Sequence, residues 1–120
     1  MGWEGEEKRK FPRVIFPCRI VIGSPIRLLV SHTENIGEGG IRVILEEKLS
    51  AHTMVGLEIY VEKEKPIKCK GKVRWIGEKV NPLDRESLLF DTGIEFVGID
   101  EADRQYIRKL VEIVLAQEKK

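Results

Sequence analysis

One segment alternates without interruption between apolar or small side chains and basic ones: Ile67-Lys68-Cys69-Lys70-Gly71-Lys72-Val73-Arg74-Trp75. The odd positions place Ile, Cys, Gly, Val and Trp on one side, and the even positions place Lys or Arg on the other. A period of two puts successive side chains on opposite faces of a β-strand. The segment therefore predicts a half-buried strand with a basic outer face.

The same period recurs on both sides of this segment. Together the alternating runs predict six strands, over residues 14–22, 26–33, 41–46, 55–62, 67–75 and 88–97. Turns rich in Gly, Pro or charge separate them, and Asn81-Pro82 predicts a longer loop before the last. We expect a mainly β protein, a six-stranded antiparallel β-barrel, because closure leaves no free strand edge.

The last segment changes to a helical period. Its apolar residues are Ile107, Leu110, Val111, Val114 and Leu115. Spacings of three and four predict a C-terminal α-helix within 100–118 that packs one apolar stripe across an opening or edge of the barrel, with Asp100 as its N-cap. An exposed part of that stripe would support a homodimer.

The length, composition and charge of the chain limit which class of protein it can be. The chain has 120 residues, of which 42% are hydrophobic and 34% charged, with a formal net charge of +1. These values predict one soluble domain over 9–120, made of an arm (9–13), the barrel (14–99) and the helix, and argue against a global attraction to DNA. Residues 1–8 mix glycine and charge and predict a flexible tail. No run approaches the roughly 18 apolar residues of a membrane span, so we expect a cytoplasmic protein without membrane insertion.

The sequence offers no catalytic motif. It contains no Walker loop, no GxSxG and no HExxH. Cys18 and Cys69 alternate with apolar residues and form no CxxC pair, which predicts buried hydrophobes rather than a metal or redox site. We expect no enzymatic activity, no cofactor and no metal.

The basic row of the 67–75 segment leaves a nucleic-acid interpretation open. Proteins that bind single strands interleave aromatic side chains with such a row, whereas Trp75 has the opposite parity. Glu58 and Glu62 would neutralise the row if the fourth and fifth strands pair as a hairpin. We therefore expect no DNA partner.

Two other segments are candidates for ligand binding: Lys8-Arg9-Lys10-Phe11-Pro12-Arg13 and Asn35-Ile36-Gly37-Glu38-Gly39-Gly40. Pro12 disfavours a helix in the first, and in an extended chain Arg9 and Arg13 point the same way, about 13 Å apart. Three glycines within four residues predict that the second is a turn whose backbone takes positive φ or approaches another group closely.

These residue types suit a ligand that contains phosphate and guanine. The arginine fork matches phosphate oxygens and the O6/N7 edge of guanine, and the Asn35 carbonyl can accept from guanine N–H donors. The backbone of Gly39 and Gly40 lets a ring come close. From composition alone, a disordered basic tail beside a plain hairpin turn remains the alternative.

Both segments resemble the motifs of a known family. Arg9-Lys10-Phe11-Pro12-Arg13 resembles the RxxxR motif of PilZ domains, bacterial receptors for cyclic di-GMP, and 35–40 resembles their [D/N]-x-S-x-x-G motif. Residues 71–76 and 93–99 also resemble the fifth and last barrel strands of that family. The resemblance spans about residues 9–116 and implies a six-stranded barrel with a C-terminal helix.

The resemblance also implies roles for individual residues. Arg9 and Arg13 would clamp guanine and phosphate from an arm that orders on binding, Asn35 would hold a guanine edge, and Gly40 would shape the turn. The residue before the motif, Lys8, has the position that influences whether one or two nucleotides stack, and a lysine leaves both open.

One residue departs from the family pattern, because its serine is Gly37 here. A lost neutral hydrogen bond is worth about 0.5–1.5 kcal/mol, or up to roughly tenfold in affinity. We expect weakened binding. The resemblance implies a receptor that changes its surface to regulate an effector protein of a flagellar, polysaccharide or secretion machine. The alternative is a degenerate PilZ-like domain that binds a protein partner but no nucleotide.

Overall fold

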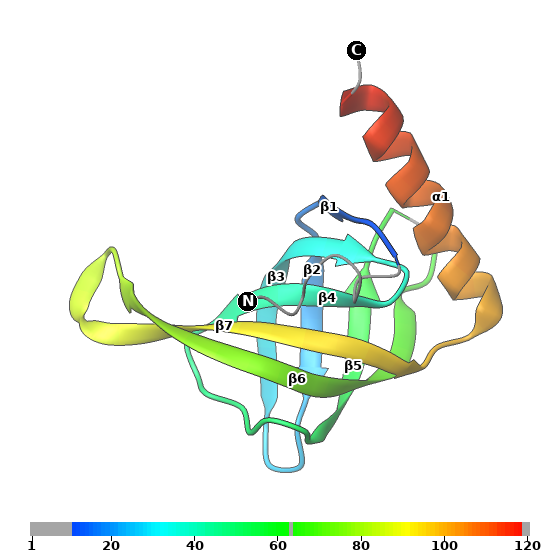
Figure 1. The fold of residues 1–120 in the computed structure, drawn as a ribbon. Helices are drawn as coiled ribbons and strands as arrows, with labels where there is room; N and C mark the ends of the chain where they lie inside the picture. Colours follow the sequence, from blue (N-terminus) through cyan, green and yellow to red (C-terminus); the bar gives the residue numbers. More distant parts are fainter. Residues whose placement is uncertain (1–10, 63, 119–120) are drawn as a thin grey trace.

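The computed structural model describes residues 11–62 and 64–118. Its elements in chain order are β1 (Arg13–Ile15), β2 (Arg19–Gly23), β3 (Leu28–Gly37), β4 (Gly40–Leu45), β5 (Met54–Tyr60), β6 (Ile67–Asn81), β7 (Asp84–Gly98) and α1 (Glu101–Glu118). The sheet runs β3-β2-β5-β6-β7-β4 and returns to β3, with antiparallel pairing throughout. This closed six-stranded barrel with a C-terminal helix confirms the predicted fold class (Figure 1).

The first barrel strand is interrupted where one continuous strand was predicted. It is divided into β1 and β2, which pair with β3 in registers that differ by one residue: Ile15 lies opposite Asn35, and Arg19 opposite His32. Pro17 between them has no N–H to give to a ladder. The Thr33 side chain bridges the interruption between β1 and β2. Its buried Oγ1 donates to the Phe16 carbonyl at 2.8 Å and accepts from the Cys18 N–H at 3.1 Å.

Strands β6 and β7 have 15 residues each and form a hairpin that projects beyond the barrel (Figure 1). The prediction of a longer loop at Asn81-Pro82 is therefore wrong. Asn81 pairs with Asp84, and its Oδ1 accepts from the Leu83 N–H at 2.9 Å, which closes a tight turn. The outer part of the hairpin is a two-stranded ribbon whose apolar residues, such as Leu83 at 94% exposure, are not buried.

Aliphatic side chains from every barrel strand fill the interior. The fully buried ones include Ile20, Ile22, Ile36, Ile41, Ile59, Ile67, Val73 and Ile107. The last belongs to α1, which adds Val111 to the core and lies near β1 and β3. Toward the C-terminal end of α1, Val114 and Leu115 are partly buried against this core, whereas Ile113 is exposed.

The helix begins where the sequence predicted. The Asp100 carbonyl accepts the first helical hydrogen bond, from the Arg104 N–H at 2.9 Å, so Asp100 has the N-cap position. Within the described part of the chain, no helix combines the length and apolarity that a bilayer crossing requires.

Candidate functional site

The Gly-rich segment forms the two-residue turn Glu38-Gly39 between β3 and β4, with Gly37 opposite Gly40. None of the described glycines has a positive φ, so of the two predicted reasons for glycine the structure supports close approach. A Cβ at Gly40 would lie 2.3 Å from the Ile94 carbonyl oxygen of β7. Gly40 therefore lets the turn lie flat against β7.

Gly37 lets the arm approach the turn. Arg13, the second arginine of the predicted clamp, lies directly opposite Gly37 in the β1–β3 pairing. A Cβ at Gly37 would lie 2.5 Å from the Pro12 carbonyl oxygen and 2.6 Å from Arg13 Cγ. The structure thus brings Arg13, Gly37 and Gly40 together. The predicted tail 1–8, and with it Lys8, as well as Arg9, lie outside the described residues.

Asn35 faces outward because of a β-bulge that the sequence did not predict. Thr33 lies opposite Val43 and Asn35 opposite Arg42, so Glu34 is the extra residue. Thr33 and Ile36 both point into the core, which leaves Asn35 on the outer face between β1 and β4. Its Oδ1 is buried and has no hydrogen-bond partner among the described residues.

The side-chain carbonyl oxygen of Asn35 indicates a place where a ligand could donate a hydrogen bond. Buried polar atoms in folded proteins almost always have a partner, and leaving one unpaired costs about 1–3 kcal/mol. A ligand that brings an N–H donor to Asn35 would recover this energy. Asn35 lies two residues from Gly37, beside which Arg13 is placed.

Across β4 from Asn35, an ion pair fixes Arg42 on the outer face. Its Nε and Nη2 donate to the two carboxylate oxygens of Asp91, each at 2.7 Å. This fork-to-fork contact raises the pKa of the Arg42 guanidinium. Sequence reasoning missed both residues because they are 49 positions apart.

Trp75 continues this outer surface on β6. The predicted inward parity of Trp75 is wrong, because a register shift after Val73 makes Arg74 an extra residue and turns the indole outward. The ring lies against Gly93, whose Cβ, if it had one, would be 2.3 Å from Trp75 Nε1. Gly93 also pairs with Arg42, so one continuous row runs from β3 to β6.

At the tip of the turn, Glu38 is 8% exposed and faces two arginines of α1. Arg108 Nη2 lies 2.8 Å from Glu38 Oε2, and Arg104 Nε lies 3.3 Å from the same oxygen. The hydrogen bond from Arg108, with a smaller contribution from Arg104, holds the pKa of Glu38 below its ordinary range. The cluster joins segments up to 70 residues apart, and its only sequence signal is the i, i+4 spacing of the arginines.

The basic row of β6 is partly neutralised across strands. Glu58 pairs with Lys68 in the β5–β6 hairpin, with Nζ and Oε2 4.0 Å apart, as the sequence predicted for Glu58. Arg74 also forms an ion pair with Glu95 of β7, with Nε and Oε1 2.9 Å apart, which was not predicted. An open hollow of about 410 Å³ beside Lys68 is lined by acid and base alike and shares no residue with the predicted ligand site. Neither the partly neutralised row nor the hollow favours binding of a polyanion such as a nucleic acid.

The closed six-stranded barrel with its C-terminal helix and Gly-rich turn defines the structural class of this domain. The PilZ domain family model matches residues 7–112, most of the chain, and the protein therefore belongs to the PilZ domain family. No curated protein sequence matches it.

Solved structures of similar fold include the following three. The Bacillus subtilis Inhibitor of motility (MotI/DgrA) has a TM-score of 0.76 at 21% identity, covering 93% of this chain and 53% of that one. The PilZ domain of Escherichia coli YcgR with c-di-GMP has a TM-score of 0.73 at 10% identity, covering 93% and 95%. The K. pneumonia MrkH–c-di-GMP complex has a TM-score of 0.71 at 14% identity, covering 93% and 55%. The chain thus spans about half the length of MotI and MrkH, and at these identities the likeness concerns the fold.

Proposed function

We propose that this PilZ domain is a non-catalytic cyclic di-GMP receptor of the cytoplasm whose surface changes on binding and thereby regulates an effector protein. The observation that supports it most directly is Asn35 Oδ1, which is buried and has no hydrogen-bond partner in the described part of the chain, on the face where Arg13 lies against Gly37. Two proteins of the same fold, YcgR and MrkH, are complexed with c-di-GMP. The site would consist of Arg9, Arg13 and Asn35 with Gly37 and Gly40, and Lys8 at its edge.

Each residue has a chemical task in this proposal. The two arginines clamp the guanines and phosphates, and Asn35 accepts from a guanine N–H. Gly37 lets arm and strand lie close enough for one ligand to touch both, and Gly40 shapes the turn against β7. Because the ligand carries two phosphate charges, binding weakens as salt screens the arginines.

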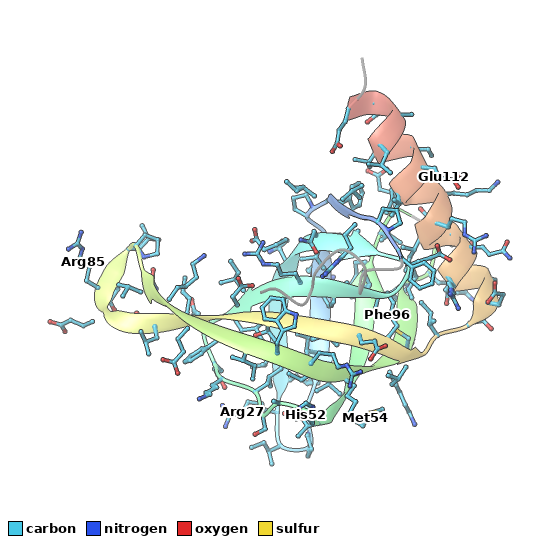
Figure 2. All side chains as sticks on the ribbon, viewed as in Figure 1. Arg27, His52, Met54, Arg85, Phe96 and Glu112 are labelled. Atoms are coloured by element: carbon cyan, nitrogen blue, oxygen red, sulfur yellow. The ribbon has the colours of Figure 1, made fainter. Side chains whose placement is uncertain are left out.

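Isothermal titration with cyclic di-GMP tests the proposal, with GTP as ligand control. Arg13→Ala should lose binding. Arg85→Ala is the matched control, because Arg85 is an exposed arginine at the far end of the projecting hairpin (Figure 2). Wild-type binding that survives Arg13→Ala would refute the clamp.

A second function has its own support. Val80, Leu83 and Leu88 of the projecting hairpin are exposed apolar residues, which suits contact with a protein. A PilZ domain that binds a protein but no nucleotide would give a flat titration with cyclic di-GMP. It would lose its partner when these three residues are replaced by serine.

A further inference from the structure

The Glu38 cluster carries a surplus of positive charge next to the motif turn. Among the three hydrogen-bonded groups, one carboxylate faces two guanidinium groups, which gives a net charge of +1. Glu101 and Glu112 of α1 also act electrostatically on Arg108. The side chain of Glu38 is 9% exposed, whereas those of Arg104 and Arg108 are 36% and 49% exposed. The cations are therefore the accessible part of the cluster.

The two arginines are not equivalent. Arg108 donates twice to Glu38 Oε2, from Nε at 3.1 Å and from Nη2 at 2.8 Å. Arg104 donates once, from Nε at 3.3 Å, and its Nη1 and Nη2 make no hydrogen bond to the described residues. Arg108 is thus the principal partner of Glu38, and Arg104 is the weaker one.

Arg104 is also placed over the arm. Its guanidinium lies 5.0 Å from the centre of the Phe11 ring. Phe11 in turn packs on the turn, since a Cβ at Gly39 would lie 3.0 Å from Phe11 Cδ2. Phe11 is two residues before Arg13, so Arg104 lies where helix, arm and turn meet.

We propose that Arg104 is a further arginine of the nucleotide site, which exchanges its single bond to Glu38 for a phosphate oxygen of the ligand. This inference rests on the proposed function. The Nη groups of Arg104, which make no hydrogen bond to the described residues, form the fork that suits phosphate, while Arg108 keeps Glu38 and the turn in place. Binding would thereby alter the contact between α1 and the turn.

Titration of cyclic di-GMP into four variants separates this role from a structural one. Arg104→Gln should weaken binding about tenfold or more and reduce its salt dependence. Glu38→Gln removes the carboxylate that competes with the ligand for Arg104, so it should bind as tightly as wild type or more tightly. Arg108→Gln leaves that carboxylate to Arg104, so it should bind less tightly than Glu38→Gln. Arg104→Lys, which keeps the charge but not the fork, should lie between wild type and Arg104→Gln.

The outcomes are distinguishable. A merely structural role predicts that all three Gln variants weaken binding in parallel with their melting temperatures, and that result would overturn the inference. Unchanged affinity in Arg104→Gln would do the same while leaving the proposed function intact. Failure of the wild-type protein to bind would overturn the proposed function and this inference with it.

Discussion

Gly37→Ser is expected to destabilise the protein, although it would restore the residue that the family motif has at this position. A Cβ at Gly37 would lie 2.5 Å from the Pro12 carbonyl oxygen and 2.6 Å from Arg13 Cγ, whereas ordinary van der Waals contact begins at 3.4 Å. Because one of the opposing atoms is backbone, β1 must move by roughly 1 Å. The arm of this chain occupies the space that a side chain at position 37 would need.

The cost follows from how β1 is attached. It pairs with β3 through only three residues, opposite Gly37, Ile36 and Asn35, and it contributes the buried Val14 to the core. Overpacking of this kind costs typically about 1–3 kcal/mol. A regained hydrogen bond is worth about 0.5–1.5 kcal/mol, so the net effect is a loss. The shift also displaces Arg13, and cyclic di-GMP affinity should fall rather than rise.

Urea denaturation of Gly37→Ala and Gly37→Ser measures this loss. Gly77→Ala and Gly77→Ser are matched controls, because Gly77 is also a strand glycine and a Cβ there has no heavy atom within 4 Å. The control variants should stay within about 0.5 kcal/mol of wild type. If the Gly37 variants unfold at the same urea concentration as the controls, or if Gly37→Ser binds more tightly at full stability, the packing argument is refuted.

Three further predictions concern stability and are checked by urea or thermal denaturation. Gly40→Ala should cost about 1–3 kcal/mol, because its Cβ would lie 2.3 Å from the Ile94 carbonyl oxygen; wild-type stability would contradict the contact with β7. Ionised Glu38 stabilises the folded state above the ordinary glutamate pKa of about 4.3, and this contribution is lost as pH falls through the lowered folded pKa. Glu38→Gln should therefore lose less stability than wild type on acidification, and parallel pH curves would exclude the effect. Ile107→Ala should cost about 2–5 kcal/mol, against little for the exposed Ile113→Ala, and equal values would contradict the packing of α1.

The fold class followed from the sequence where one face of an element is buried. The 67–75 segment has a clear period of two because Ile67 and Val73 point into the core while the lysines meet solvent. The helix was predictable for the same reason, since Ile107 and Val111 lie on one stripe. Beyond the barrel this signal disappears. The outer part of the β6–β7 hairpin has no buried face, so its strands run further than any alternation indicates.

The bulges and ion pairs could not be predicted from local pattern. A bulge at Glu34 or Arg74 inserts one residue and reverses the parity of those that follow, which is why Trp75 faces outward. Glu38 looks like an ordinary surface residue until the closed barrel brings it to α1. The Gly-rich turn was predicted from glycine spacing, but that spacing did not say which groups approach.

Each of the three glycines of the motif turn lets a different part of the chain approach closely. The arm, the turn and β7 are therefore packed together at the site. Gly37 lies against the arm at Arg13, Gly39 lies against the Phe11 ring, and Gly40 lies against the backbone of β7. Arg104 then covers Phe11 from the helix. In the proposed function, a ligand that binds between arm and turn would therefore alter contacts that α1 shares. The surface offered to an effector would change at the helix because the helix is where the motif segments meet.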